Sequence, residues 1–354
     1  MHVADDEERR KVLLEKNKGR VCPTPFLRFD VWRDGRVAVC CTDWMQGDVI
    51  IGNVFEQGWN EIWNSETAKR IRKSVTDGSF SHCTEKCPWL ADARLPLREG
   101  LSEEERAIAD NPEADLKHPP EFIKLVNDDS CNLSCPSCRH EVFVENNSNS
   151  EEIFEANMQV VYPMLKNAKV LDILGNGEAL ASKATMKLLN TLDARTHRNL
   201  TIDLLTNATH FNANAWERLK NVHPLNLRLN ISADGATKET YEKLRRGGKW
   251  EAFNANLEFI GNLRRENKIS LLTINFTVQA DNYRELPLIG DFARRYNADR
   301  VLLFRLMRWP HMSDEYFAHV DIFSSSHPLH QDFLTTVKGF SDPMVEIGPL
   351  SMFV

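Results

Sequence analysis

Between residues 121 and 310, short apolar segments alternate with longer segments of helical periodicity, and few folds accommodate that order. The apolar segments have the length and the β-branched content of buried strands. They are residues 121–126, 169–174, 200–205, 226–232, 271–278 and 300–306. The helical segments between them are residues 150–166, 182–195, 212–220, 237–246, 250–266 and 283–296. Strands that alternate with helices predict a parallel sheet in an α/β fold, either open or closed into a partial barrel.

A cysteine-rich loop follows the first expected strand. Cys131, Cys135 and Cys138 have C-x3-C-x2-C spacing. Three thiolates on one short loop can hold three irons of a [4Fe-4S] cluster, which leaves the fourth iron open to a ligand that is not protein. Ligands of parallel sheets bind beyond the carboxyl ends of the strands, where this loop is expected to lie. The alternative interpretation of the loop is a structural zinc site.

A second set of cysteines lies in the N-terminal quarter of the chain: Cys22, Cys40, Cys83 and Cys87. Residues 26–32 and 36–40 alternate like two paired strands around the turn Asp34-Gly35, which places Cys40 at a strand end. The four thiolates can close around either a [4Fe-4S] cluster or a zinc ion. The adjacent Cys41 is an alternative ligand, because neighbouring strand residues point to opposite faces.

The whole-chain composition is that of a globular enzyme. At 354 residues, with 42% hydrophobic and 27% charged residues, the chain can bury large cores and is expected to hold two domains. A net charge of −7 disfavours a broad nucleic-acid-binding surface. The sequence has no apolar run of membrane-spanning length, and its first residues do not resemble a secretory signal. Clustered cysteines favour metal ligation in a reducing cytoplasm over disulfides.

The expected domain organisation has four parts. An N-terminal unit covers residues 1–90, including a helix expected at 59–73, and a linker follows at 91–120. Ser102 opens a short helix in this linker through a capping box. The strand–helix region covers residues 121–310, and the last part, 311–354, is a C-terminal extension with little periodicity.

The order of these motifs resembles the radical S-adenosylmethionine (radical SAM) superfamily. Residues 174–178, Leu-Gly-Asn-Gly-Glu, resemble the family's glycine-rich turn after the second strand. Thr206-Asn207 resembles the dipeptide that ends the third strand. Residues 231–248, which begin Ile-Ser-Ala-Asp-Gly and end Arg-Arg-Gly-Gly, resemble the fourth-strand region of SPASM-type members. The resemblance spans most of residues 121–310 and implies a partial (β/α)6 barrel.

The resemblance also implies which residues meet SAM. Glu178 supplies a carboxylate suited to the methionine ammonium group, and glycines let the backbone approach the ligand. Ser232 and Arg245 are candidates for the methionine carboxylate. The full expected set is Gly175, Asn176, Gly177, Glu178, Asn207, Ser232 and Arg245. The alternatives are an ordinary strand–helix turn at residues 175–178 and a solvated helix residue at Arg245.

Residues 22–87 resemble a Twitch domain, the shortened form of the SPASM domain. The family's C-x(9–15)-G-x4-C element is found here as Cys22, Gly35 and Cys40. By this resemblance the second cysteine set binds one auxiliary [4Fe-4S] cluster, in a small N-terminal α+β domain. In the family this domain usually follows the radical SAM core, whereas here it precedes the core. Cys41 is then either a buried inert thiol or a donor of a hydrogen atom to a substrate radical.

The implied activity is reductive cleavage of SAM to a 5′-deoxyadenosyl radical that abstracts hydrogen from a substrate C–H bond. The expected outcome is oxidation or epimerisation of a peptide or protein side chain, with a flavodoxin- or ferredoxin-type protein as reductant. One alternative is a carbohydrate or aminocyclitol dehydrogenase or epimerase. The other is an iron–sulfur electron carrier without catalysis. The expected cofactors are two [4Fe-4S] clusters and SAM, and no nucleic-acid or membrane partner is expected.

Overall fold

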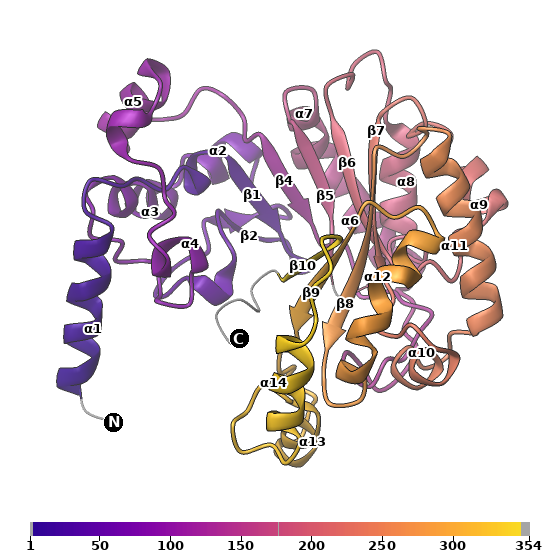
Figure 1. Ribbon diagram of the computed structural model, residues 1–354. Coiled ribbons are helices and arrows are strands. Elements are labelled where there is room, and N and C mark those ends of the chain that lie inside the picture. Colours follow the sequence, from indigo (N-terminus) through magenta and orange to yellow (C-terminus); the bar gives the residue numbers. More distant parts are fainter. Residues whose placement is uncertain (1–2, 176, 348–354) are drawn as a thin grey trace. The chain divides into compact units, whose positions relative to one another are not determined.

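The computed structural model of the protein describes residues 3–175 and 177–347. The chain divides into two compact units, whose elements are labelled in Figure 1. Unit 1 comprises Met1–Val126 and Glu155–Asp172, and unit 2 comprises Asn127–Phe154 and Ile173–Val354. The domain boundaries expected from the sequence stay predictions.

The strands of unit 1 form a mixed sheet in the order β5-β4-β1-β2-β3. They are β1 (Arg28–Val31), β2 (Arg36–Ala38), β3 (Gly52–Asn53), β4 (Phe122–Leu125) and β5 (Val170–Ile173). Strand β4 pairs in parallel with β1 and β5, whereas the β1–β2 and β2–β3 pairs are antiparallel. The expected hairpin is present, and Gly35 at its turn has φ +78°, a conformation that favours glycine. The hairpin that precedes Cys40 therefore extends the sheet from β4.

Two helices of the N-terminal region begin at serine caps. Ser102 Oγ accepts from Glu105 N at 3.2 Å in the expected capping box of α5. The helix expected at 59–73 is divided in two, because Ser65 caps a second helix by accepting from Ala68 N at 3.3 Å. The helices up to β5 are α1 (Val3–Lys16), α2 (Trp59–Trp63), α3 (Glu66–Thr76), α4 (Pro88–Ala91), α5 (Glu103–Asp110), α6 (Asn147–Ala156) and α7 (Tyr162–Leu165). A π-helical turn, Asn157–Val161, lies between α6 and α7.

Unit 2 contains an all-parallel array of strands in the order β10-β9-β8-β7-β6. They are β6 (Thr201–Thr206), β7 (Asn226–Ser232), β8 (Leu271–Val278), β9 (Arg300–Arg305) and β10 (Val345–Ile347). The helices that follow β5 are α8 (Lys183–Thr191), α9 (Ala213–Arg218), α10 (Lys238–Leu244), α11 (Trp250–Arg265), α12 (Leu286–Arg295), α13 (Asp314–Val320) and α14 (His330–Lys338). Alternating strands and helices confirm the predicted α/β class, and the array is open, as in a partial barrel.

The two faces of the unit 2 sheet differ in polarity. On β6 and β7, one face presents the buried side chains of Ile202, Leu204, Leu227 and Leu229. In Figure 1, α8, α9 and α11 flank these strands. Many of the residues that alternate with them across the array are polar and half-buried: Asp203, Arg228, Asn230, Ser232, Asn275 and Arg300. They lie among apolar residues such as Leu205, Leu302 and Phe304. The apolar face forms the core under the helices, and the polar face remains available for hydrogen bonds.

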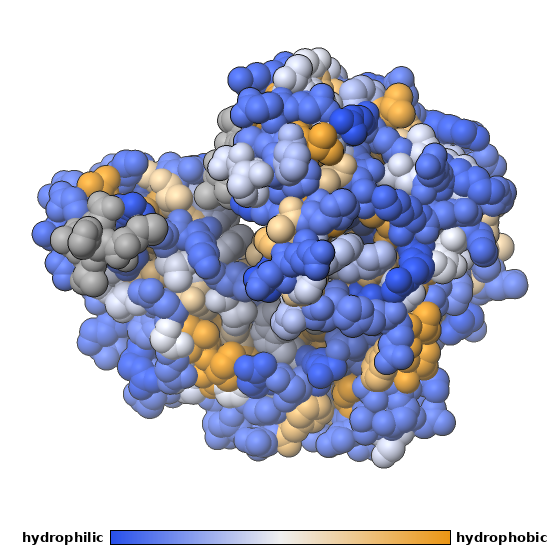
Figure 2. Space-filling model, turned by 90° about the horizontal axis from the view of Figure 1, so that it is seen from below, coloured by the Kyte–Doolittle hydropathy of each residue, from blue (hydrophilic) through white to orange (hydrophobic). Residues whose placement is uncertain are grey.

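The face of the molecule drawn in Figure 2 is largely polar. Hydrophilic residues dominate the side seen in Figure 2, and apolar residues form small, separate patches there. Across residues 3–175 and 177–347, no helix has both the length and the apolar character that a membrane span needs.

Candidate iron–sulfur and ligand site

The cysteine loop lies in unit 2 and folds back on itself. Cys138 N donates to Cys135 O at 2.9 Å, and Cys131 N donates to Phe143 O at 2.7 Å. Cys131 and Cys135 are buried against Leu133, and the half-buried Cys138 packs against the same cluster. The structure therefore brings together the three thiols that the sequence singled out.

Each sulfur of the loop has a nitrogen donor nearby. The three pairs are Asn207 Nδ2 with Cys131 Sγ at 3.9 Å, Arg245 Nη1 with Cys135 Sγ at 4.0 Å and Arg139 Nη2 with Cys138 Sγ at 3.8 Å. Burial raises the pKa of Cys131 and of Cys135, because a buried thiolate loses its hydration. The neighbouring cations lower these pKa values only in part. Further positive charge, such as that of iron, would favour the thiolate forms that bind metal.

A buried ion pair stands beside Cys135. Arg245 Nη2 lies 2.7 Å from Asp234 Oδ2, and the side chains are 15% and 3% exposed. Asp234 also accepts from Thr277 N at 2.7 Å. Burial by itself lowers the pKa of Arg245, but Asp234 and the Cys135 thiol outweigh burial and raise it. Arg245 is therefore a buried cation, in contrast to the alternative of a solvated helix residue. Its Nε has no hydrogen-bond partner within the described residues.

The glycine-rich turn packs against the chain that leads into the loop. A Cβ at Gly177 would lie 2.7 Å from Asp128 O and 2.8 Å from Ser130 O, which is too close for a carbon atom. Packing therefore requires glycine at this position. Gly175 is exposed at a bend, and Asn176 lies outside the described residues.

Glu178 is buried and already holds three donors. Its Oε1 accepts from Thr206 Oγ1 at 2.6 Å and from Leu180 N at 3.3 Å, and its Oε2 accepts from Asn207 N at 2.6 Å. Burial raises the pKa of Glu178, and these hydrogen bonds lower it only in part. A carboxylate has about four lone-pair sites, so Glu178 can accept one more donor.

Asn207 and Ser232 lie at the carboxyl ends of parallel strands. Asn207 directly follows β6, and its Nδ2 donates to Asn132 Oδ1 of the cysteine loop at 3.0 Å. Ser232 is the last residue of β7, is half-buried, and lies opposite Asn275 of β8. Both residues are thus at the edge where parallel sheets bind ligands.

Sequence reasoning gave no role to Arg139, Asp234 or His311. Arg139 directly follows Cys138, so its position beside the last cysteine of the loop could have indicated that it lies near the sulfur. The ring nitrogen His311 Nε2 lies 3.5 Å from Pro136 O, and the His311 ring packs against that of His140 with centroids 5.0 Å apart. His311 is far from the loop in sequence, and no local pattern indicates its position.

The second cysteine set lies in unit 1 at the ends of separate segments. Cys22 precedes the 3-10 helix Thr24–Phe26, Cys40 follows β2, and Cys83 and Cys87 precede α4. Burial, followed by neighbouring thiols of the set, raises the pKa of Cys22, of Cys40 and of Cys83, and the pKa of Cys83 is brought to about 12. Four thiols from distant parts of the sequence are therefore close enough to influence one another electrostatically.

Cys41 has different surroundings from Cys40. The groups that act on the pKa of Cys40 include the thiols of Cys22, Cys83 and Cys87. Burial raises the pKa of Cys41 as well, but its charged neighbours are Asp43, Lys124 and Arg28. Cys40 is therefore the one of the two that shares its environment with the other three cysteines.

Both cysteine sets suit iron–sulfur clusters in their donor chemistry. Within the described ranges, no three His, Cys, Asp or Glu side chains converge as ligands of a single metal ion do. A [4Fe-4S] cluster is bound differently, because each thiolate binds its own iron. The loop offers three thiols with donors beside them, and the second set offers four thiols, of which Cys22, Cys40 and Cys83 have pKa values raised by burial and by neighbouring thiols.

Residues 22–88 match the family SPASM, described as an iron-sulfur cluster-binding domain. The match includes all four cysteines of the second set and Cys41. It confirms the predicted SPASM-type iron–sulfur domain.

Solved structures resemble the chain more weakly. Streptococcus suis SuiB bound to S-adenosylmethionine matches with TM-score 0.44 and 14% identity, over 80% of this chain and 61% of that chain. SuiB bound to precursor peptide SuiA gives 0.43 and 14%, over 80% and 62%. Native anSMEcpe with bound AdoMet and the Cp18Cys peptide gives 0.39 and 15%, over 60% of each chain. The chain thus spans less than two thirds of the SuiB chain, and likenesses this weak carry no functional argument. No curated protein matches the sequence.

Proposed function

We propose that this protein is a radical SAM enzyme with one [4Fe-4S] cluster on Cys131, Cys135 and Cys138 and an auxiliary cluster on the second cysteine set. The observation that carries the proposal is the loop, in which three thiols of one packed cluster each have a nitrogen donor nearby. Three thiolates leave one iron free for SAM, whereas structural zinc sites have four protein ligands. The SPASM match supports the auxiliary cluster.

A cluster on the loop would supply one electron for the reductive cleavage of SAM, and this cleavage would drive hydrogen abstraction from the substrate. The chain's own residues orient the reactants and exclude water. Glu178 offers its remaining lone pair to the methionine ammonium group. Arg245 offers its unpartnered Nε–H to the methionine carboxylate, with Ser232 as a second donor. Residues 175–177 and Asn207 complete this binding site.

The polar face of the unit 2 sheet supports a peptide as the substrate. Asn275 lies opposite Ser232, and its Oδ1 is buried without a hydrogen-bond partner in the described part of the chain. A buried carbonyl left unpaired is costly, so a ligand N–H that pairs with it would stabilise binding. On the same face, Asn230 donates to Asp203. Amide side chains both donate and accept, which matches the backbone of a peptide. The proposed reaction is therefore oxidation or epimerisation of a peptide side chain.

The auxiliary cluster suits the role of electron acceptor. A reaction that removes two electrons from the substrate needs an acceptor for the second one after the hydrogen atom has been taken. In an epimerisation, Cys41 is the candidate hydrogen donor, because the charged groups that act on its thiol are Asp43, Lys124 and Arg28 rather than the thiols of the second set. A flavodoxin- or ferredoxin-type protein would supply the first electron, in a reducing cytoplasm.

The test is anaerobic reconstitution, followed by counting iron and adding dithionite and SAM. About eight irons per chain and release of 5′-deoxyadenosine would support the proposal, since each cluster holds four irons. About four irons with one zinc and no nucleoside would contradict it. For the substrate, transfer of deuterium into 5′-deoxyadenosine from a deuterated peptide pool supports the peptide class. Transfer only from a deuterated sugar pool would move the assignment to carbohydrates.

A further inference from the structure

The segment between α3 and α4 carries two of the four auxiliary thiols, Cys83 and Cys87, and contains no helix or strand. Within it, Phe80 has φ +45°, which side-chain-bearing residues seldom adopt. The Phe80 side chain is only 1% exposed. A residue in such a conformation persists where its surroundings hold it in place. This cysteine segment therefore depends on contacts from other elements.

Arg10 of α1 provides three such contacts. Its Nη1 donates to Cys83 O at 3.0 Å, and its Nη2 donates to Ser79 O at 2.9 Å and to Phe80 O at 2.6 Å. A guanidinium is a rigid fork of donors, so one side chain fixes three carbonyls at once. Helix α1 ends at Lys16, before the SPASM match begins at residue 22. Arg10 therefore lies outside the matched domain, whereas the three carbonyls that it contacts lie within it.

The cysteine segment is held from another side by the chain after Cys41. Gln46 N donates to His82 O at 3.0 Å, and Thr84 N donates to Trp44 O at 2.8 Å. These main-chain bonds leave the carbonyls of residues 79 and 83 to Arg10. Removing Arg10 would therefore deprive one side of the segment of its donors.

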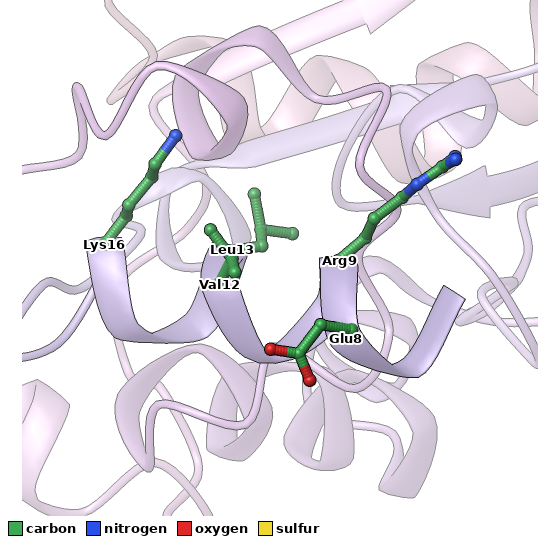
Figure 3. Close-up of a pocket in the computed structure, with 5 residues that line it drawn as sticks. All are labelled: Glu8, Arg9, Val12, Leu13 and Lys16. Carbon is green, nitrogen blue, oxygen red and sulfur yellow. The ribbon is translucent and has the colours of Figure 1, made fainter. Parts of the chain in front are cut away.

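Helix α1 is itself anchored in unit 1. Leu13 is 8% exposed, and Asn17 Nδ2 donates to Leu90 O at 2.8 Å. Figure 3 shows Val12 and Leu13 lying between Arg9 and Lys16, which border a pocket of about 250 Å³ along the helix. An anchored helix holds Arg10 at a fixed position beside the cysteine segment.

Among the side chains that the structure describes, no carboxylate forms an ion pair with Arg10. Arg28, the cation beside Cys40, instead lies 2.7 Å from Asp30. Arg10 places positive charge beside Cys83, whereas the charge of Arg28 is paired with that of Asp30.

We infer that Arg10 is a positioning residue for the auxiliary cluster, which holds the Cys83 segment through three carbonyls and raises the cluster's reduction potential. The inference rests on the proposed auxiliary cluster. Reduction adds negative charge to a cluster, so a nearby cation favours the reduced state. The hydrogen bonds of Arg10 also keep the thiols of the segment placed for iron.

The test uses the full chain with Cys131, Cys135 and Cys138 replaced by alanine, so that only the auxiliary cluster is loaded. A redox titration followed by electron paramagnetic resonance gives its midpoint potential, and a chelator gives its rate of iron loss. Arg10→Gln should shift the potential to a more negative value and speed iron loss. Arg10→Lys keeps the charge but not the fork, so its potential should stay nearer the parent while iron loss is still faster.

Arg20→Gln is the matched control. Arg20 also donates to a main-chain carbonyl of this region, Leu95 O, but makes no contact with the cysteine segment. Its potential and iron retention should equal those of the parent. If Arg10→Gln behaves like Arg20→Gln in both measurements, the role of Arg10 is overturned. If the parent chain itself binds no cluster, the proposal of an auxiliary cluster is overturned. This outcome is seen before any Arg10 variant is measured, so it is distinct from a failure of the Arg10 inference.

Discussion

The two cysteine sites differ in where their ligands come from and in what surrounds them. The loop site draws three thiols from residues 131–138, and donors from Arg139, Asn207 and Arg245 approach their sulfurs. The second site draws four thiols from segments spread over residues 22–87, and these thiols act mainly on one another. The loop is therefore a site with room for a further ligand, and the second set is suited to close around its cluster.

The difference also sets how each site depends on the fold. Bringing together ligands of one short loop costs little loop-closure entropy. Ligands from distant segments come together only after those segments have been ordered, which costs more entropy. The second site accordingly has supports from far away, such as the guanidinium of Arg10. The loop relies instead on side chains at the ends of unit 2 strands.

The largest expected effect separates the two sites by activity. Cys135→Ala should abolish SAM cleavage, because two thiolates cannot hold the cluster with its open iron. The measurement is 5′-deoxyadenosine formed after anaerobic reconstitution and addition of dithionite. Ser137→Ala, a change in the same loop that removes no thiol, should retain cleavage. Normal cleavage by Cys135→Ala would refute the assignment of the loop.

The second prediction distinguishes two adjacent thiols. Cys40→Ala should lose about four of eight irons while SAM cleavage persists, because the loop cluster is untouched. Cys41→Ala should keep its full iron content, since its neighbours are Asp43, Lys124 and Arg28 rather than thiols. Iron and sulfide analysis of both reconstituted variants checks this. The reverse pattern would make Cys41 the ligand.

The third prediction concerns the ion pair beside Cys135. Asp234→Asn should destabilise the protein by about 3–5 kcal/mol, because it leaves the buried Arg245 charge without its partner. Asparagine tolerates the φ of +57° at this position, so the backbone is kept. Denaturant titration measures the change. Asp281→Asn removes a more exposed pair with Lys243, in which the side chains are 20% and 59% exposed, and should cost about 0–1 kcal/mol. Equal costs for both variants would contradict the role of burial.

The smallest expected effect tests the packing beneath the loop. Gly177→Ala should cost about 1–3 kcal/mol, because its methyl group would press against the carbonyls of Asp128 and Ser130. Slower SAM cleavage should accompany the loss, since these residues lead into Cys131. Gly100→Ala, where a Cβ meets no atom within 4 Å, is the control for thermal unfolding. A Gly177→Ala protein as stable as this control would rule out the packing argument.

Much of the fold was predictable because it follows from local periodicity. The six strands expected between 121 and 310 all occur, each end within one residue of its expected position. The prediction of one continuous helix at 59–73 was wrong, because Ser65 caps a second helix within this range. Strand β10 pairs with β9 but is only three residues long, which is too short to show an alternation of apolar and polar residues in the sequence.

The sequence by itself determined the thiols, their spacing and the alternation of strands and helices, because each of these features depends only on residues that are close together along the chain. Tertiary structure decided which groups surround the thiols. It paired Arg245 with Asp234, placed Asn207 beside Cys131 and brought Arg10 to Cys83. These contacts join residues far apart along the chain, and burial gives them their strength. Neither the distance nor the burial can be read from local sequence.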